Sequence, residues 1–136
     1  MKLEYLFVYG SLRKALGHPA HEFVQKYYDY IGEAKTKGIL YNLSDFPAAI
    51  QTEEEKYIVG ELYKIKNLDE LSFAMAQIDD YEGILDEDGN IPLYKKVKGD
   101  VLLKNGDTTK AWIYFYNRLI ENHNVIESGD ILDFQN

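Results

Sequence analysis

The sequence predicts an α+β fold built on a small, mixed and curved β-sheet that closes towards a barrel. Most apolar segments have the length and alternation of strands, and one segment repeats at helical spacing. The connections between segments are too short for regular βαβ units. The 136 residues contain no internal repeat or linker, so we expect one domain over residues 1–136.

In the first half of the chain, glycine, proline and charged turns separate the strand-like segments. Gly32 and Gly38 interrupt one long β-prone segment, where they favour bends or bulges. Pro19 suits the first turn of a short helix over His18–Gln25. The expected strands are Leu3–Tyr9, one or two within Tyr27–Leu43, Ala49–Thr52 after a turn at 45–48, and Tyr57–Ile65.

A longer helix is predicted where the apolar spacing changes to three or four residues. Asn67 stands before the first of these positions and Glu70 follows three residues later, which is the pattern of a capping box. Gly83 suits the C-terminal stop of this helix, and 86–90 reads as a polar loop. The apolar positions are Leu68, Leu71, Met75 and Ile78.

A β-hairpin is predicted in the second half, because Asn105-Gly106 is a strong hairpin signal. Its arms are Leu93–Leu103 and Thr108–Tyr116. The tail, Val125–Phe134, contains a further glycine turn at 128–130. Alternation in the second arm places two sets of side chains on opposite faces: Ala111, Ile113 and Phe115 on one, and Trp112, Tyr114 and Tyr116 on the other.

Charge and composition exclude several classes of partner. The formal net charge of −8 argues against a nucleic-acid or anionic-membrane surface, although local N–H groups or one basic side chain can still hold a small anion. The absence of cysteine excludes disulfides and thiolate chemistry. Glu4 interrupts any leader-like apolar stretch, and no apolar run approaches the roughly 20 residues that span a bilayer. We expect a cytoplasmic protein, monomeric or weakly dimeric.

The loop after the first strand, Tyr9-Gly10-Ser11-Leu12-Arg13, is the first candidate site. Glycine lets a ligand approach the backbone, whose successive N–H groups can bind an anion or a carbonyl oxygen. Ser11 would add a hydroxyl and Arg13 a charge. The segment matches neither a phosphate-binding Walker loop nor a dinucleotide fingerprint. The structural alternative is an ordinary strand-to-loop turn with an exposed arginine.

Glu82 is the second candidate, because it ends a helix whose last turn also carries Asp79 and Asp80. Carboxylates are unfavourable at this negative pole of the helix dipole, and such local conflicts are typical of functional sites. Like charges and burial both raise a carboxyl pKa, as a general base requires. The alternative is a solvated acidic helix end.

The histidines indicate a metal centre only weakly. His18 and His21 are three residues apart, His123 is distant in sequence, and no carboxylate stands at ligand spacing beside them. We expect no metal and no cofactor. Ser11 lacks the Gly-x-Ser-x-Gly context of a nucleophile elbow. A metal-dependent hydrolase that uses these histidines is therefore the weakest of the functional hypotheses.

Together, six segments resemble the γ-glutamyl cyclotransferase-like family, which includes γ-glutamylamine cyclotransferases and AIG2-like proteins. Their similarity covers nearly the whole chain. Lys95 and Ile131 stand where many members have Arg and Trp, which affects the expected pocket shape and substrate. The segments are FVYGSLR (7–13), FPA (46–48), VGELY (59–63), DDYEG (79–83), AWIY (111–114) and IESGD (126–130).

The resemblance implies a small mixed β-barrel with flanking helices and a cofactor-free, metal-independent transferase or lyase. Such an enzyme cyclises a γ-glutamyl amide or γ-glutamylamine to 5-oxoproline. By position, Glu82 matches the catalytic acid/base. The loop Tyr9, Gly10, Ser11, Leu12 and Arg13 matches the loop that holds the glutamyl group, and Tyr114 or Tyr116 would line the cavity. A non-catalytic module that binds a small anionic metabolite on the same fold is the alternative.

Overall fold

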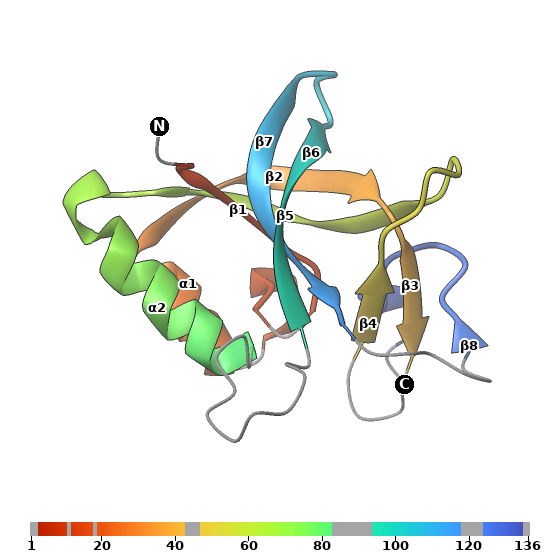
Figure 1. Cartoon of the computed structure of the whole chain (residues 1–136). Coiled ribbons are helices and arrows are strands. Elements are labelled where there is room, and N and C mark those ends of the chain that lie inside the picture. Colours follow the sequence, from red (N-terminus) through yellow and green to blue (C-terminus); the bar gives the residue numbers. More distant parts are fainter. Residues whose placement is uncertain are drawn as a thin grey trace.

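Five strands close into a mixed barrel in the computed structural model, which describes residues 3–10, 12–17, 19–42, 47–82, 94–117 and 124–134 (Figure 1). Leu6 pairs with Trp112 in parallel, and this contact closes the barrel, whose other ladders are antiparallel. The expected α+β class and barrel are thereby confirmed. In spatial order the strands are β1 (Tyr5–Val8), β5 (Tyr57–Ile65), β2 (Tyr28–Lys37), β6 (Tyr94–Leu103) and β7 (Thr108–Tyr116).

A three-stranded sheet lies beside the barrel, in the order β4-β3-β8 (Figure 1). Its strands are β3 (Ile39–Asn42), β4 (Pro47–Ile50) and β8 (Asn124–Val125). The expected bounds of Ala49–Thr52 were wrong by two residues at each end, because Pro47 and Ala48 already pair with β3. Gly32 marks a register shift in β2, and Gly38 separates β2 from β3, so both expected interruptions are confirmed.

The helices α1 (Glu22–Gln25) and α2 (Leu71–Glu82) pack together on one side of the barrel (Figure 1). Asn67 accepts a hydrogen bond from the Asp69 N–H at 3.0 Å, which confirms the predicted cap. The first turn after it is a 3₁₀ helix, and Gly83 and the loop 86–90 lie outside the described residues. The elements are η1 (Lys14–Leu16), η2 (Pro19–His21), α1 (Glu22–Gln25), η3 (Leu68–Glu70), α2 (Leu71–Glu82) and η4 (Ile131–Phe134).

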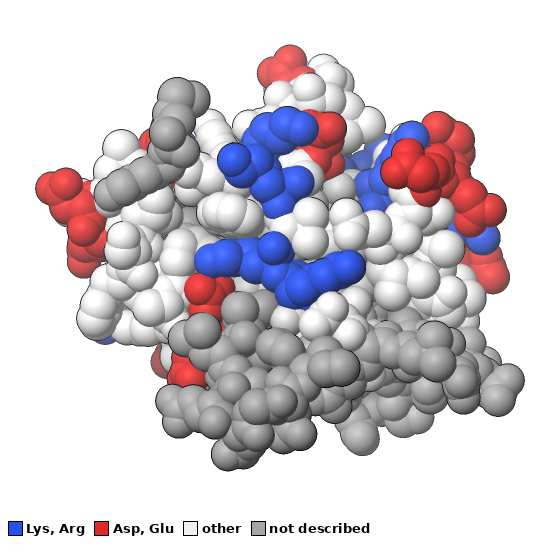
Figure 2. All heavy atoms as spheres, viewed as in Figure 1, with Lys and Arg blue, Asp and Glu red and all other residues white. Residues whose placement is uncertain are grey.

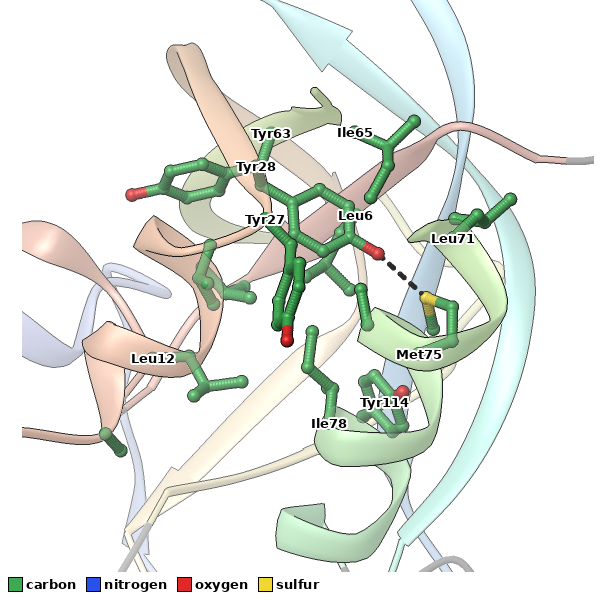
Figure 3. Close-up of a cluster of buried hydrophobic side chains, with 14 residues drawn as sticks. Leu6, Leu12, Tyr27, Tyr28, Tyr63, Ile65, Leu71, Met75, Ile78 and Tyr114 are labelled. Atoms are coloured by element: carbon green, nitrogen blue, oxygen red, sulfur yellow. Dashed lines mark hydrogen bonds between the residues drawn. The ribbon is translucent and has the colours of Figure 1, made fainter. Parts of the chain in front are cut away.

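Alternation along the strands separates two apolar cores. On β7, the side chains of Ile113 and Phe115 belong to one cluster and that of Tyr114 to the other. The Tyr114 cluster includes Ala74 and Ile78 of α2, so it lies between the barrel wall and the helices (Figure 3). The opposite strand faces therefore fill the barrel interior. No helix among the described residues has the length and apolar character needed to cross a membrane.

Candidate functional site

The loop after β1 begins with a tight turn. The Arg13 N–H donates to the carbonyl oxygen of Gly10 at 2.9 Å, which draws these two residues together. Tyr9 is buried with the barrel core, and Leu12 is buried with the helix-side core. The chain thus crosses from one core to the other within three residues. Ser11 lies outside the described residues.

Tyr9 and Tyr114 join this loop to β7 and then to α2. The Tyr9 hydroxyl donates a short hydrogen bond to the backbone carbonyl of Tyr114. The Tyr114 hydroxyl donates to a carboxylate oxygen of Asp79 at 2.5 Å, and Figure 3 shows the Tyr114 ring beside Ile78 of α2. Three segments that are distant in sequence therefore meet at one place.

Asp79 also pairs with a cation. The Lys96 ammonium lies 3.0 Å from the second Asp79 oxygen, and both side chains are about four-fifths buried. The same ammonium lies 5.0 Å from the centre of the Trp112 ring, a cation–π contact. Lys96 thus compensates part of the unfavourable charge at the end of α2. Glu82 is the last residue of this helix, three positions after Asp79, and its side chain lies outside the described residues.

Basic side chains gather near this site despite the negative net charge. Figure 2 shows Lys and Arg grouped on the face where Figure 1 places β6. That strand carries Lys95, Lys96 and Lys98. Tyr116 lies near the end of β7, with its ring centre 5.9 Å from that of its cross-strand neighbour Tyr94. The local charge can attract a small anion, although the whole molecule is acidic.

Arg13 is buried, so the alternative of an exposed arginine is wrong. Only 2% of its side chain is accessible. Its Nη1 lies 2.7 Å from Asp130, and its Nε lies 3.4 Å from Glu61. Whether Arg13 also touches a ligand stays a prediction, but its charge faces two carboxylates of the protein.

Glu61 is a residue that the sequence reasoning did not single out. Its buried carboxylate accepts hydrogen bonds from the Lys14 and Ala15 N–H groups at 2.6 and 3.1 Å and from the Tyr63 hydroxyl at 2.8 Å. Burial and then this bond to Glu61 raise the pKa of Tyr63, which stays a neutral donor. The available signal was an acidic residue among the apolar side chains of β5.

The histidine hypothesis gains no support from His21. Its Nδ1 lies 2.9 Å from the carbonyl oxygen of Leu12, and its ring centre is 5.9 Å from that of Tyr63. His18 and His123 lie outside the described residues. Within the described parts of the chain, no three His, Cys, Asp or Glu side chains converge as metal ligands would.

This barrel, with a glycine loop linked to an acidic helix end, is the architecture expected of the cyclotransferase class. The model of the family "Gamma-glutamyl cyclotransferase, AIG2-like" matches residues 6–133, and the chain belongs to that family. Membership confirms the resemblance seen in the sequence and the class of enzyme it implies, a cyclotransferase that acts on small molecules.

Relatives from three organisms are similar over nearly their whole length. A Methanocaldococcus jannaschii protein, provisionally named a gamma-glutamylcyclotransferase, is 35% identical over 98% of this chain and 99% of its own. A Vibrio cholerae protein with the same provisional name is 31% identical over 92% of each chain. A crystal structure of a Pyrococcus horikoshii protein superposes with a TM-score of 0.66 at 23% identity, covering 96% of this chain and 92% of that one. This last likeness shows the fold.

Proposed function

We propose that the protein releases 5-oxoproline from a γ-glutamyl amide or γ-glutamylamine, with Glu82 as general acid/base. The observation that carries the proposal is the chain of hydrogen bonds from Tyr9 through Tyr114 to Asp79. It links the β1 loop to the helical turn that ends in Glu82, in a member of this family. An intramolecular cyclisation needs a proton carrier close to the loop that holds the substrate, and these hydrogen bonds connect the two segments that would supply them.

The reaction needs one proton carrier. The α-amine of the substrate is an ammonium at neutral pH, and Glu82 takes a proton from it. The free amine attacks the γ-carbonyl carbon, so a C–N bond closes the five-membered lactam. Glu82 returns the proton to the departing nitrogen as the original γ-amide bond breaks, and it then takes the second proton that the lactam nitrogen must lose, which leaves on the released amine. Because nucleophile and electrophile share one molecule, the protein chiefly holds the folded conformer, and no cofactor is required.

Asp79 is the obvious competitor of Glu82 for this role, and its contacts make it the poorer choice. Lys96 and Tyr114 engage both of its oxygens. Because each oxygen of Asp79 already contacts a protein partner, this carboxylate is less accessible to a substrate amine. We therefore assign proton transfer to Glu82 and a supporting role to Asp79.

The β1 loop would hold the glutamyl part of the substrate. Backbone N–H groups of Gly10, Ser11 and Leu12 can bind the α-carboxylate or the developing oxyanion, with Tyr9 behind them and Tyr114 or Tyr116 in the wall. A donor aimed at the oxyanion is typically worth about 3–4 kcal/mol in the transition state. Arg13 belongs to the same loop.

The test is 5-oxoproline release from a panel of γ-glutamyl amino acids, γ-glutamylamines and ε-(γ-glutamyl)lysine. We expect turnover of at least one compound by the wild type and a loss of 10²-fold or more in Glu82→Gln, in line with general acid/base catalysis. Asp80→Asn is the matched control, because this exposed carboxylate lies two positions away on the same helix. Equal release by the wild type and Glu82→Gln would remove Glu82 from its role.

Calorimetry with glutamate, 5-oxoproline and glutathione separates the enzyme from the non-catalytic binding module. Binding without turnover of any panel compound would favour the module, since a pocket can persist without its chemistry. Neither binding nor turnover would contradict both proposals.

A further inference from the structure

A buried ion-pair network lies directly behind the β1 loop. Arg13 contacts Glu61 of β5 and Asp130 of the C-terminal turn, at 3.4 and 2.7 Å. Arg13 and Glu61 are almost fully buried, and Asp130 is one-fifth exposed. Charges are removed from water in this way only when they are closely compensated, and here one guanidinium bridges two carboxylates.

Glu61 caps a helix that it does not belong to. The N-cap residue of η1 is Arg13, whose side chain makes no capping hydrogen bond. The free N–H groups of the first turn are instead satisfied from β5, because the Glu61 carboxylate accepts from Lys14 and Ala15. A negative charge is favourable at this end of a helix. Glu61 therefore fixes the backbone immediately after the Gly10–Arg13 turn.

Asp130 extends the network to the C-terminal segment. Its carboxylate accepts from Arg13 and from the Leu132 N–H at 2.9 Å. The carbonyl of the preceding Gly129 accepts from the Val59 N–H of β5 at 2.8 Å. The loop, β5 and the C-terminal turn are thus held as one unit through Arg13.

We propose that Arg13 and Glu61 are positioning residues, which hold the backbone of residues 13–15 and so orient the adjoining loop for binding the glutamyl group. Arg13 acts through the loop, and the loop N–H groups contact the ligand. The proposal rests on the proposed function for its catalytic consequence. Its structural part, that Glu61 and Arg13 immobilise this backbone, stands on the contacts alone.

The structural part is tested by hydrogen–deuterium exchange in Glu61→Gln, Arg13→Lys and Asp130→Asn. We expect exchange at residues 10–16 to rise tenfold or more in Glu61→Gln, with unchanged protection of the β6–β7 hairpin. Glu55→Gln is the matched control, since Glu55 forms a comparable ion pair with Lys37 on the surface. A uniform rise across the chain, or no rise in the loop, would overturn the proposal. If Glu61→Gln does not fold, Asp130→Asn, whose carboxylate is partly exposed, supplies the same comparison.

The catalytic part is tested by kinetics on the panel compound that the wild type turns over. We expect Glu61→Gln to lower kcat/KM at least tenfold, while the pH of the acid limb stays where Glu82 sets it. Arg13→Lys keeps the positive charge but cannot bridge the two carboxylates. We expect its kcat/KM to lie between those of the wild type and Glu61→Gln. A direct role of Arg13 in ligand binding predicts a different result, because Glu61→Gln leaves the guanidinium on its 2.7 Å contact with Asp130 and KM would be retained. Retained or improved KM in Glu61→Gln would therefore overturn the positioning role.

The two proposals fail in distinguishable ways. A wild type that releases no 5-oxoproline contradicts the proposed function, and the exchange measurement then still decides the role of Glu61 and Arg13. An active wild type whose Glu61→Gln variant keeps both its kcat/KM and its loop protection supports the function and contradicts the positioning role.

Discussion

The Tyr114 hydroxyl donates to the Asp79 carboxylate at 2.5 Å and so joins the end of β7 to the last turn of α2. The backbone carbonyl of the same tyrosine accepts from the Tyr9 hydroxyl. Tyr114 therefore contacts both halves of the candidate site, the loop through its main chain and the helix through its side chain. These two contacts connect the loop and the helix end through one residue.

Tyr114→Phe should lower the free energy of unfolding by about 1.5–3 kcal/mol, the usual range for a hydrogen bond to a charged group. The loss arises because the partly buried Asp79 keeps its charge but loses one donor. Urea denaturation measures it. Tyr57→Phe removes the same kind of bond, to Glu55 on the surface, and should change stability little because water replaces the lost donor. Equal effects in the two variants would contradict the importance of the Tyr114 bond.

Lys96→Met should lower the free energy of unfolding by roughly 1 kcal/mol, at the upper end for ion pairs near the surface. The partly buried carboxylate of Asp79 then loses its ammonium partner. Lys98→Met is the control, because Lys98 also lies over Trp112, at 5.9 Å, so it removes the cation–π contact alone. Urea denaturation measures both variants, and equal losses would contradict this account.

Gly129→Ala should be severely destabilising. Gly129 has a φ of +74°, and an added Cβ would lie 1.9 Å from the carbonyl oxygen of Tyr57. Gly17 has a similar φ of +71° with nothing within 4 Å of an added Cβ, so Gly17→Ala isolates the conformational cost, about 1–2 kcal/mol. We expect thermal denaturation to show that Gly129→Ala lowers the free energy of unfolding at least twice as much as Gly17→Ala does. Similar losses of stability in the two variants would mean that the C-terminal turn shifts to accommodate the new methyl group.

Alkaline pH should destabilise the protein through its buried tyrosines. Burial, and then the charge of Asp79, raise the pKa of Tyr28 above its ordinary value of 10.0. Above that pH the unfolded chain has lost the proton and the folded chain retains it. The free energy of unfolding therefore falls as pH rises, by up to about 1.4 kcal/mol per pH unit for this group.

Tyr28→Phe tests that cause, because it removes the titrating hydroxyl and only a weak bond to the Met75 sulfur (Figure 3). Denaturant midpoints measured between pH 8 and 12 should fall less steeply in this variant. An unchanged slope would show that Tyr28 does not contribute to the alkaline dependence.

Local sequence signals predicted most of the elements. Tyr57–Ile65 became β5 with the expected bounds, and Asn105-Gly106 connects β6 to β7 as a hairpin. The alternation on β7 correctly separated the two buried faces. These features depend on neighbouring residues, whose spacing alone decides the face on which each side chain lies.

Local signals of this kind cannot predict contacts between segments that are distant in the sequence. Arg13 is 48 positions from Glu61 and 117 from Asp130. No local pattern shows that a loop arginine will be buried between two carboxylates. Glu61 went unnoticed because an acid in a strand usually faces solvent.

Most strands, the helix cap, the hairpin and the family can be read from the amino-acid sequence, because each depends on residue spacing or on a short motif. How the barrel closes through β1 and β7, where Tyr114 meets α2, and which carboxylates pair with Arg13 became visible only in the folded chain. Burial explains this difference. A charge or hydroxyl removed from water must find a partner wherever the fold brings one, irrespective of the distance along the chain.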